Sequence, residues 1–376
     1  MPSAKKILFS ISLTYLAVTA CLGTLLLGFL FLEWRSTVKK PAMPTASQVD
    51  LSPELVPYIM FGPPRNTTIQ DIYMPAARED TSKPAIYINQ YGFRYRDMSI
   101  KKQAGTIRFF VVGGSVVFYG HTNESTISGC LEALLREEFA PRRVEIINAG
   151  ISGVISDQEL MLIVGKLIDF SPDGIIAFDG FNDCMIPSSF EQRLGYPYKF
   201  KTLEVAWYES TSVLRNLSEL PFTDHVRAGS HFLRRFSPDW SYVHYLENKK
   251  GTHVPEGAPV PTAEAVAEHL LTNWRKMASF LSANRVAGLF VLQPFKEDGH
   301  TFKLQYDAIE TGMGELAEEF SSCDPPILFR SFRRVMDDKQ DWYNDIVHTF
   351  DEGNAYYAEL LQREVSNLGP WTKEDL

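Results

Sequence analysis

The sequence has few cysteines, no excess of basic residues and no internal repeat. Its four cysteines, Cys21, Cys130, Cys184 and Cys323, are scattered over 376 residues and form no CxxC pair, so they predict neither a disulfide framework nor a cysteine-ligated metal site. Lys and Arg number 37 against 46 Asp and Glu, which gives a formal net charge of -9. Broad nucleic-acid binding usually needs a basic face, so we expect no nucleic-acid partner.

Charge is also missing from one long segment, Ile7 to Leu32. As a helix it would span roughly 39 Å, more than the ~30 Å hydrocarbon layer, whereas a cleaved signal peptide has an apolar region of about 7–15 residues. We therefore predict a short tail at 1–6 and an uncleaved transmembrane signal anchor at 7–32. Val18-Thr19-Ala20-Cys21 also resembles a lipoprotein cleavage box, but the apolar segment after it favours a cysteine within a membrane helix. The flanking charges are too balanced to fix orientation.

The rest of the chain divides by composition into a linker and one large domain. Residues 33–84, which are rich in Pro, Ser and Thr from Val38 to Pro64, are predicted to form a stalk, and residues 85–376 are predicted to form one large domain. Within this domain, Ala85 to Arg96 alternates and is aromatic, which indicates a short strand packed on the domain.

From Ile107 onward, apolar strand-like runs alternate with amphipathic helical segments. This alternation predicts an α/β domain whose parallel sheet is covered on both faces. In the second helix we expect Leu160, Ile163, Val164, Leu167 and Ile168 to face inward. Strands are expected at Ile107–Val112, Val144–Ile147, Gly174–Phe178, Val286–Leu292 and Ile327–Phe329, and helices at Ser125–Phe139, Ser156–Phe170, Ala263–Ala283, Phe302–Phe320 and Glu352–Val365.

Residues 191–257 break this rhythm and are rich in aromatic side chains. We interpret them as an insertion beside the functional site. Its aromatic residues either pack the insertion's own core or contact a sugar or an acyl chain.

Three short motifs follow the first three predicted strands. They are Gly113-Gly114-Ser115, Asn148 to Gly153 and Gly180-Phe181-Asn182-Asp183. Ligands of a parallel α/β sheet bind outside the carboxyl ends of its strands, so the fold is expected to bring these motifs together. A fourth motif, Asp345-Ile346-Val347-His348, precedes the last helix.

Together the motifs supply the groups for acyl transfer. Ser115 is the candidate nucleophile and needs an adjacent base. His348 is the candidate base, and Asp345 would fix its tautomer. Gly153, Asn182 and the backbone N–H of Ser115 are the candidate oxyanion donors.

Each motif alone is an ordinary turn or cap, and the prediction depends on all four occurring in order. Gly150 remains an alternative to Gly153 as the donor in the second motif. No other group of His and carboxylate residues has metal-ligand spacing.

The series resembles the SGNH/GDSL hydrolase superfamily, whose blocks run Gly-Asp-Ser, Gly, Gly-x-Asn-Asp and Asp-x-x-His. The resemblance covers about Ile107 to Leu361 and implies a flavodoxin-like three-layer α/β/α sandwich with no metal or organic cofactor. The family's nucleophile, glycine, asparagine, histidine and triad acid fall on Ser115, Gly153, Asn182, His348 and Asp345.

Two departures stand beside the nucleophile. Gly114 replaces the Asp of Gly-Asp-Ser, as in the GGS-type branch, and Val116 and Val117 stand where polar residues often follow. GGS-type members with one amino-terminal membrane helix resemble bacterial envelope proteins, which implies an inner-membrane location with the catalytic domain on the periplasmic side.

The leading hypothesis is a membrane-anchored serine esterase that removes an acyl group, such as O-acetyl, from a glycan or a lipid. One alternative is an acyltransferase of envelope polysaccharide that uses the same triad. Another is a binding or scaffold protein on a hydrolase fold.

Overall fold

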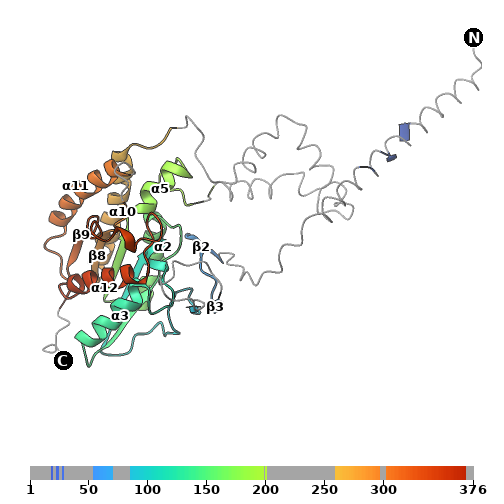
Figure 1. Ribbon diagram of the computed structural model, residues 1–376. Helices are drawn as coiled ribbons and strands as arrows, with labels where there is room; N and C mark the ends of the chain where they lie inside the picture. The colour runs from blue at the N-terminus through green and yellow to red at the C-terminus, as the bar shows by residue number, and fades with distance from the viewer. Residues whose placement is uncertain are drawn as a thin grey trace, which may run out of the picture. The chain divides into compact units, whose positions relative to one another are not determined.

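A computed structural model describes residues 54–70, 85–198, 200, 259–296 and 302–369, together with positions 18, 19, 23, 24 and 28. Two compact units are present. One comprises Met1–Ser47 with Leu203–Lys250, and the other comprises Gln48–Thr202 with Gly251–Leu376. In the first unit the five described positions are helical. The second unit contains the sheet and the labelled helices (Figure 1).

Within the described part of the chain, no helix has the length and apolar character needed to cross a bilayer. Apart from the five helical positions, the predicted anchor at 7–32 lies outside the described residues and stays a prediction. Most of the predicted insertion, residues 201–257, also lies outside them.

Five parallel strands form the central sheet. In spatial order β6-β5-β7-β8-β9, they have the 2-1-3-4-5 arrangement of flavodoxin-like folds. Every residue of β5, β7 and β8 is buried, as expected for a sheet covered on both faces. The predicted parallel sheet is confirmed, with bounds β5 Thr106–Gly113, β6 Arg143–Asn148, β7 Gly174–Asp179, β8 Ala287–Leu292 and β9 Ile327–Ser331.

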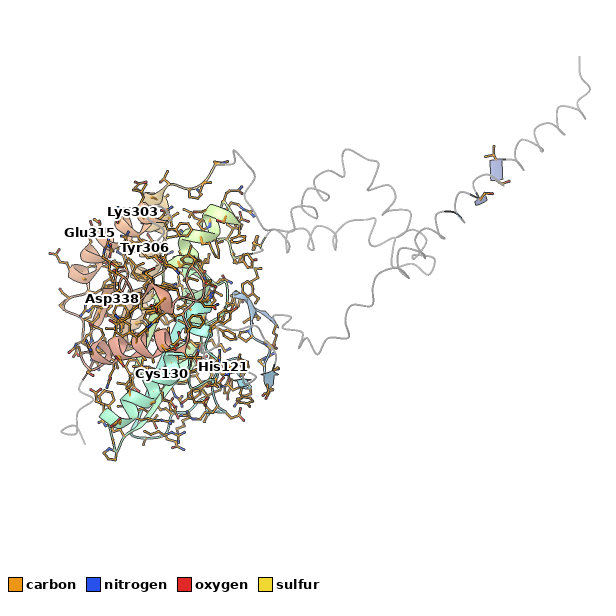
Figure 2. All side chains as sticks on the ribbon, in the orientation of Figure 1. His121, Cys130, Lys303, Tyr306, Glu315 and Asp338 are labelled. Atoms are coloured by element: carbon orange, nitrogen blue, oxygen red, sulfur yellow. The ribbon has the colours of Figure 1, made fainter. Side chains whose placement is uncertain are left out.

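Helices cover both faces of this sheet. Helix α3 (Ile127–Glu138) packs along α12 (Asp351–Val365) on one face. On the other, α10 (Ala263–Ala283) packs against α4 (Ser156–Gly165) and α11 (Lys303–Glu319). Side chains fill the space between these layers (Figure 2). Three shorter elements complete this part of the fold: the α-helices α2 (Ser115–Phe118) and α5 (Phe181–Ser189), and the 3-10 turn Gln340–Trp342.

The second predicted helix differs from expectation in length and in its inner face. It ends at Gly165, and Leu167–Phe170 forms a separate 3-10 turn. Val164, expected inside, is 38% exposed, whereas Glu159 is buried. The apolar pattern was wrong here because two polar side chains, Gln158 and Glu159, occupy the inner face.

The predicted boundary between stalk and domain is also wrong. Strands β1 (Glu54–Val56) and β2 (Met60–Gly62) form one antiparallel pair, and β3 (Thr67–Gln70) pairs with β4 (Ala85–Ile88). Ile59 lies in the main core, and its carbonyl accepts a hydrogen bond from Nε2 of Gln158 at 2.6 Å. A Pro-rich segment can therefore belong to the domain, because packing on a core stabilises hairpins that are marginal alone.

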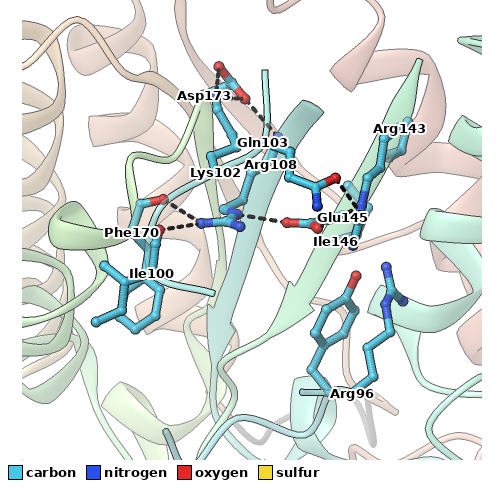
Figure 3. Close-up of polar contacts among 12 residues, drawn as sticks. Arg96, Ile100, Lys102, Gln103, Arg108, Arg143, Glu145, Ile146, Phe170 and Asp173 are labelled. Carbon is cyan, nitrogen blue, oxygen red and sulfur yellow. Dashed lines mark hydrogen bonds and ion pairs between the residues drawn. The ribbon is translucent and has the colours of Figure 1, made fainter. Parts of the chain in front are cut away.

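A polar network joins β5, β6 and the residue before β7 near the amino ends of these strands (Figure 3). Arg108 of β5 is fully buried and pairs with Glu145 of β6 at 2.8 Å. Lys102 pairs with Asp173, which precedes β7, at 2.6 Å. Asp173 also accepts the backbone N–H of Arg108. Since a buried ion pair is costly to break by removing one partner, these contacts hold the strands in register.

Candidate active site

The turn that carries Ser115 has no space for side chains at the two positions before it. Gly113 has φ +155°, and a Cβ there would lie 2.7 Å from the carbonyl oxygen of Phe178. A Cβ on Gly114 would lie 2.3 Å from Nδ2 of Asn182. Glycine at 114 therefore lets the Asn182 amide lie directly against the nucleophile turn.

Ser115, His348 and Asp345 form a continuous relay. The Ser115 hydroxyl lies 2.8 Å from Nε2 of His348, and Nδ1 of His348 lies 2.7 Å from Oδ2 of Asp345. Because an ionised carboxylate only accepts hydrogen bonds, Nδ1 carries the ring proton and Nε2 is left to accept from Ser115. The structure thus brings together residues 233 positions apart in the chain.

Asp345 is held by its own loop. Its Oδ1 accepts the backbone N–H groups of Val347 at 2.9 Å and His348 at 2.8 Å. Burial raises the pKa of Asp345, but the hydrogen bonds from the His348 ring and from these two N–H groups outweigh it and lower the pKa to about 2. The carboxylate therefore stays ionised throughout the pH range in which an imidazole titrates.

Asn182 lies in the first turn of helix α5, against the turn that carries Ser115. Its Nδ2 donates to the carbonyl oxygen of Val154 at 2.7 Å. An amide nitrogen carries two hydrogens, so this bond orients the group and leaves the second hydrogen available.

The second motif offered two glycines, and their surroundings differ. The N–H of Gly150 donates to Oδ1 of Asn148 at 3.0 Å, and a Cβ at 150 would lie 2.8 Å from the backbone nitrogen of Phe118. Gly150 therefore serves packing. The N–H of Gly153 has no acceptor within the described residues, and the ring of Tyr198 lies against this glycine. The geometry favours Gly153 as the donor.

Asn148 joins the first two motifs. Its Nδ2 donates to the carbonyl oxygen of Val117 at 2.7 Å. Val116 and Val117, the apolar residues after Ser115, are buried in the core. Their packing in the core holds the turn in place, while Ser115 stays partly accessible.

Two residues near the site could not be found from the motifs. The Tyr119 ring packs on the His348 ring with centroids 4.7 Å apart. Arg94 is buried and donates to the carbonyl oxygens of Phe118 at 2.5 Å and Gly120 at 2.8 Å, on either side of Tyr119. Only the aromatic segment around Arg94 hinted that this part of the chain packs on the domain.

No group of three or more His, Cys, Asp and Glu residues is arranged to hold a metal ion in the part of the chain that the structure describes. Cys184, which follows the Asn182 motif, is fully buried, and burial raises the pKa of its thiol. It has the character of a packing residue rather than a nucleophile.

This chain is similar to solved structures, but its sequence matches no family model and no curated protein. Among solved structures, the acetyl xylan esterase AlAXEase is 14% identical over 69% of this chain and 100% of its own, with a TM-score of 0.41. LAE5, an alpha/beta hydrolase enzyme from the metagenome of Lake Arreo, Spain, is 14% identical over 70% and 97%, with a TM-score of 0.41.

A GDSL-like lipase from Bacteroides thetaiotaomicron VPI-5482 is 14% identical over 69% of this chain and 87% of its own, with a TM-score of 0.35. The three structures are named as an acetyl xylan esterase, an alpha/beta hydrolase enzyme and a GDSL-like lipase.

Proposed function

We propose that this protein is an SGNH-type serine esterase. The observation that carries the proposal is the relay from Ser115 through His348 to Asp345, with contacts of 2.8 and 2.7 Å. The Asn182 amide lies beside the nucleophile turn and supports the same reading. A buried turn alone would need neither the ordered imidazole nor the ionised Asp345 behind it.

In the proposed reaction, Oγ of Ser115 attacks the ester carbonyl carbon while its proton passes to Nε2 of His348. The second amide hydrogen of Asn182 and the N–H groups of Gly153 and Ser115 stabilise the oxyanion. His348 then protonates the departing alcohol, which leaves an acyl-serine. Water attacks this ester with His348 as base, and the acid product leaves as Ser115 regains its proton.

The substrate we propose is an acyl ester, such as an O-acetyl ester, of a glycan or a lipid. Tyr119 and Tyr198, packed on His348 and Gly153, place aromatic surface at two points of the site. Aromatic rings of this kind provide apolar area together with a polar hydroxyl group.

We also propose that the uncharged run Ile7–Leu32 anchors the protein in the inner membrane with the catalytic domain outside the cytoplasm. A reporter fused after Leu376 that is active only when exported should then be active in cells. Activity of a cytoplasm-only reporter at the same position would reverse this orientation.

The enzymatic proposal is tested with a fluorophosphonate probe and with p-nitrophenyl acetate. The wild-type protein should be labelled and should turn over the ester, and Ser115→Ala should do neither while keeping its fold. Ser99→Ala, at an exposed serine, is the matched control and should behave as wild type. Labelling without turnover would replace hydrolysis by acyl transfer to another acceptor. A folded wild-type protein that shows neither would favour a binding or scaffold role.

A further inference from the structure

A buried contact joins the two segments that carry the proposed oxyanion donors. Oδ1 of Asp183, the residue after Asn182, accepts the hydroxyl of Ser156 at 2.6 Å. The backbone N–H of Ser156 also lies 3.2 and 3.3 Å from the two carboxylate oxygens of Asp183. Since Asn182 donates to Val154, two consecutive residues of α5 bind two residues of the segment that follows Gly153.

The direction of the Ser156 hydroxyl is fixed by a third helix. Nδ2 of Asn273, on α10, donates to Oγ of Ser156 at 2.9 Å. A hydroxyl group has one hydrogen to donate. Because Oγ of Ser156 accepts the hydrogen bond from Asn273, its own hydrogen is directed to Asp183. Ser156 and Asn273 are 0% exposed and Asp183 is 6% exposed, so water does not compete for these groups.

The position of Asp183 explains why a carboxylate is found here. Asp183 lies in the first turn of α5, and its oxygens face the first residue of α4. It therefore meets the amino-terminal ends of two helices, where the helix dipole and unpaired N–H groups favour negative charge. Burial opposes this attraction and raises the pKa of Asp183 to about 7, so the attraction acts fully only when the carboxyl group is ionised, above that pH.

We propose that Ser156 and Asp183 are positioning residues that hold the Asn182 amide and the Gly153 N–H in register for the oxyanion. The inference depends on the proposed esterase function, because it assigns the pair to that reaction. Neither side chain touches the reacting atoms. They act by fixing the distance between the start of α5 and the segment from Gly153 to Ser156.

The test compares Ser156→Ala with wild type in steady-state ester hydrolysis. A donor displaced by about 1 Å can cost up to about 100-fold in rate, so we expect kcat to fall about 10- to 100-fold with little change in KM. Asp183→Asn keeps the size of the side chain and one acceptor oxygen, and should retain more activity than Asp183→Ala. Ser188→Ala, on the same helix with its hydroxyl bonded to the carbonyl of Cys184, is the matched control and should keep wild-type kcat.

A double variant separates positioning from general stability. If Ser156 acts through the Asn182 amide, Ser156→Ala combined with Asn182→Ala should lose less kcat than the product of the two single losses. Independent, multiplicative losses would overturn the inference, as would wild-type kcat in Ser156→Ala. Should Ser156→Ala not fold, Asn273→Ala should still lower kcat, by a smaller factor and with KM unchanged, and an unchanged kcat there would refute the pair.

The two proposals fail in different ways. If Ser115→Ala retains wild-type turnover, the esterase assignment falls and the inference falls with it. If turnover requires Ser115 and the Ser156 and Asn273 variants are indistinguishable from wild type in kcat, the positioning role alone is wrong.

Discussion

The replacement of Asp345 by asparagine gives the sharpest test of the proposed relay. In the native loop, Oδ1 of Asp345 accepts two backbone N–H groups and Oδ2 faces Nδ1 of His348. In Asp345→Asn the amide oxygen must take the place of Oδ1, because only an oxygen can accept the two backbone N–H groups. The NH₂ group is then forced to face Nδ1, and a donor there requires Nδ1 to accept. The ring proton moves to Nε2, and His348 no longer accepts the proton of Ser115.

The expected loss follows from this change of tautomer. A triad Asp→Asn change with intact geometry costs about 10⁴-fold in kcat, or about 5 kcal/mol of activation free energy. The side chain changes by one atom and Oδ1 keeps both backbone contacts, so the free energy of unfolding should change by far less. The assay is kcat for p-nitrophenyl acetate from pH 5 to 9, with thermal unfolding measured on the same samples.

The control is Asp338→Asn, an isosteric change at an exposed aspartate that pairs with Lys339. It should keep wild-type kcat at every pH. If Asp345→Asn keeps kcat within about tenfold of wild type, the loop does not impose the tautomer and the relay described here is wrong.

Three further outcomes are expected. Asn182→Ala should lower kcat by about 10²–10³ with a small change in KM, since an oxyanion donor acts mainly in the transition state; an equal change in KM would reassign it to substrate binding. Arg94→Met should lower the free energy of unfolding by about 3 kcal/mol in denaturant titrations, because it leaves buried carbonyl groups such as that of Gly120 unpaired; a change within experimental error would refute this account. Glu159→Gln should flatten the pH dependence of the melting temperature between pH 5 and 8, because burial raises the pKa of Glu159 and keeps it protonated in the folded protein. An unchanged slope would show that the folded protein does not hold a proton on Glu159.

The sequence alone predicted the sheet, and it named candidate site residues that the structure brings together, Ser115, His348 and Asp345. Buried parallel strands such as Thr106–Gly113 are continuous apolar runs, which leave a clear signal. Parallel order then brings their carboxyl ends to one edge, so the residues after each strand meet even when they are far apart in sequence. Ser115 and Asn182 follow strands in this way. His348 was recognised by its spacing from Asp345 and by the helix after it.

What the sequence did not predict depends on tertiary packing. Arg94 lies more than 20 residues before Ser115 in the chain, and nothing in its neighbourhood distinguishes a buried guanidinium from a surface one. Gly153 and Gly150 could not be separated, because the answer depends on the Asn148 side chain bonding to one of them. Glu159 had the pattern of an exposed residue in a first turn, but it is buried.

The burial of Glu159 places three acids in the interior beside the site, with Asp179 and Asp183. Within the described residues, no N–H or hydroxyl group donates to either oxygen of Glu159. Two ionised carboxylates buried side by side would repel each other, which favours a proton on one of the pair Glu159 and Asp179. Burial together with the neighbouring charges of Asp179 and Asp183 raises the pKa of Glu159, which makes Glu159 the protonated partner.

The buried acids make the free energy of unfolding depend on pH. Burial raises the pKa of Asp179 to about 6 and that of Asp183 to about 7, from an ordinary value of 3.8. Above that ordinary value the folded protein keeps protons that the unfolded chain releases, so the free energy of unfolding falls as pH rises toward 7, by up to about 1.4 kcal/mol per pH unit for each retained proton. The proposed hydrolysis needs the unprotonated imidazole of His348, which accepts the proton of Ser115. The free energy of unfolding should therefore be larger at pH 5 than at pH 7, and denaturant titrations at the two pH values measure the difference.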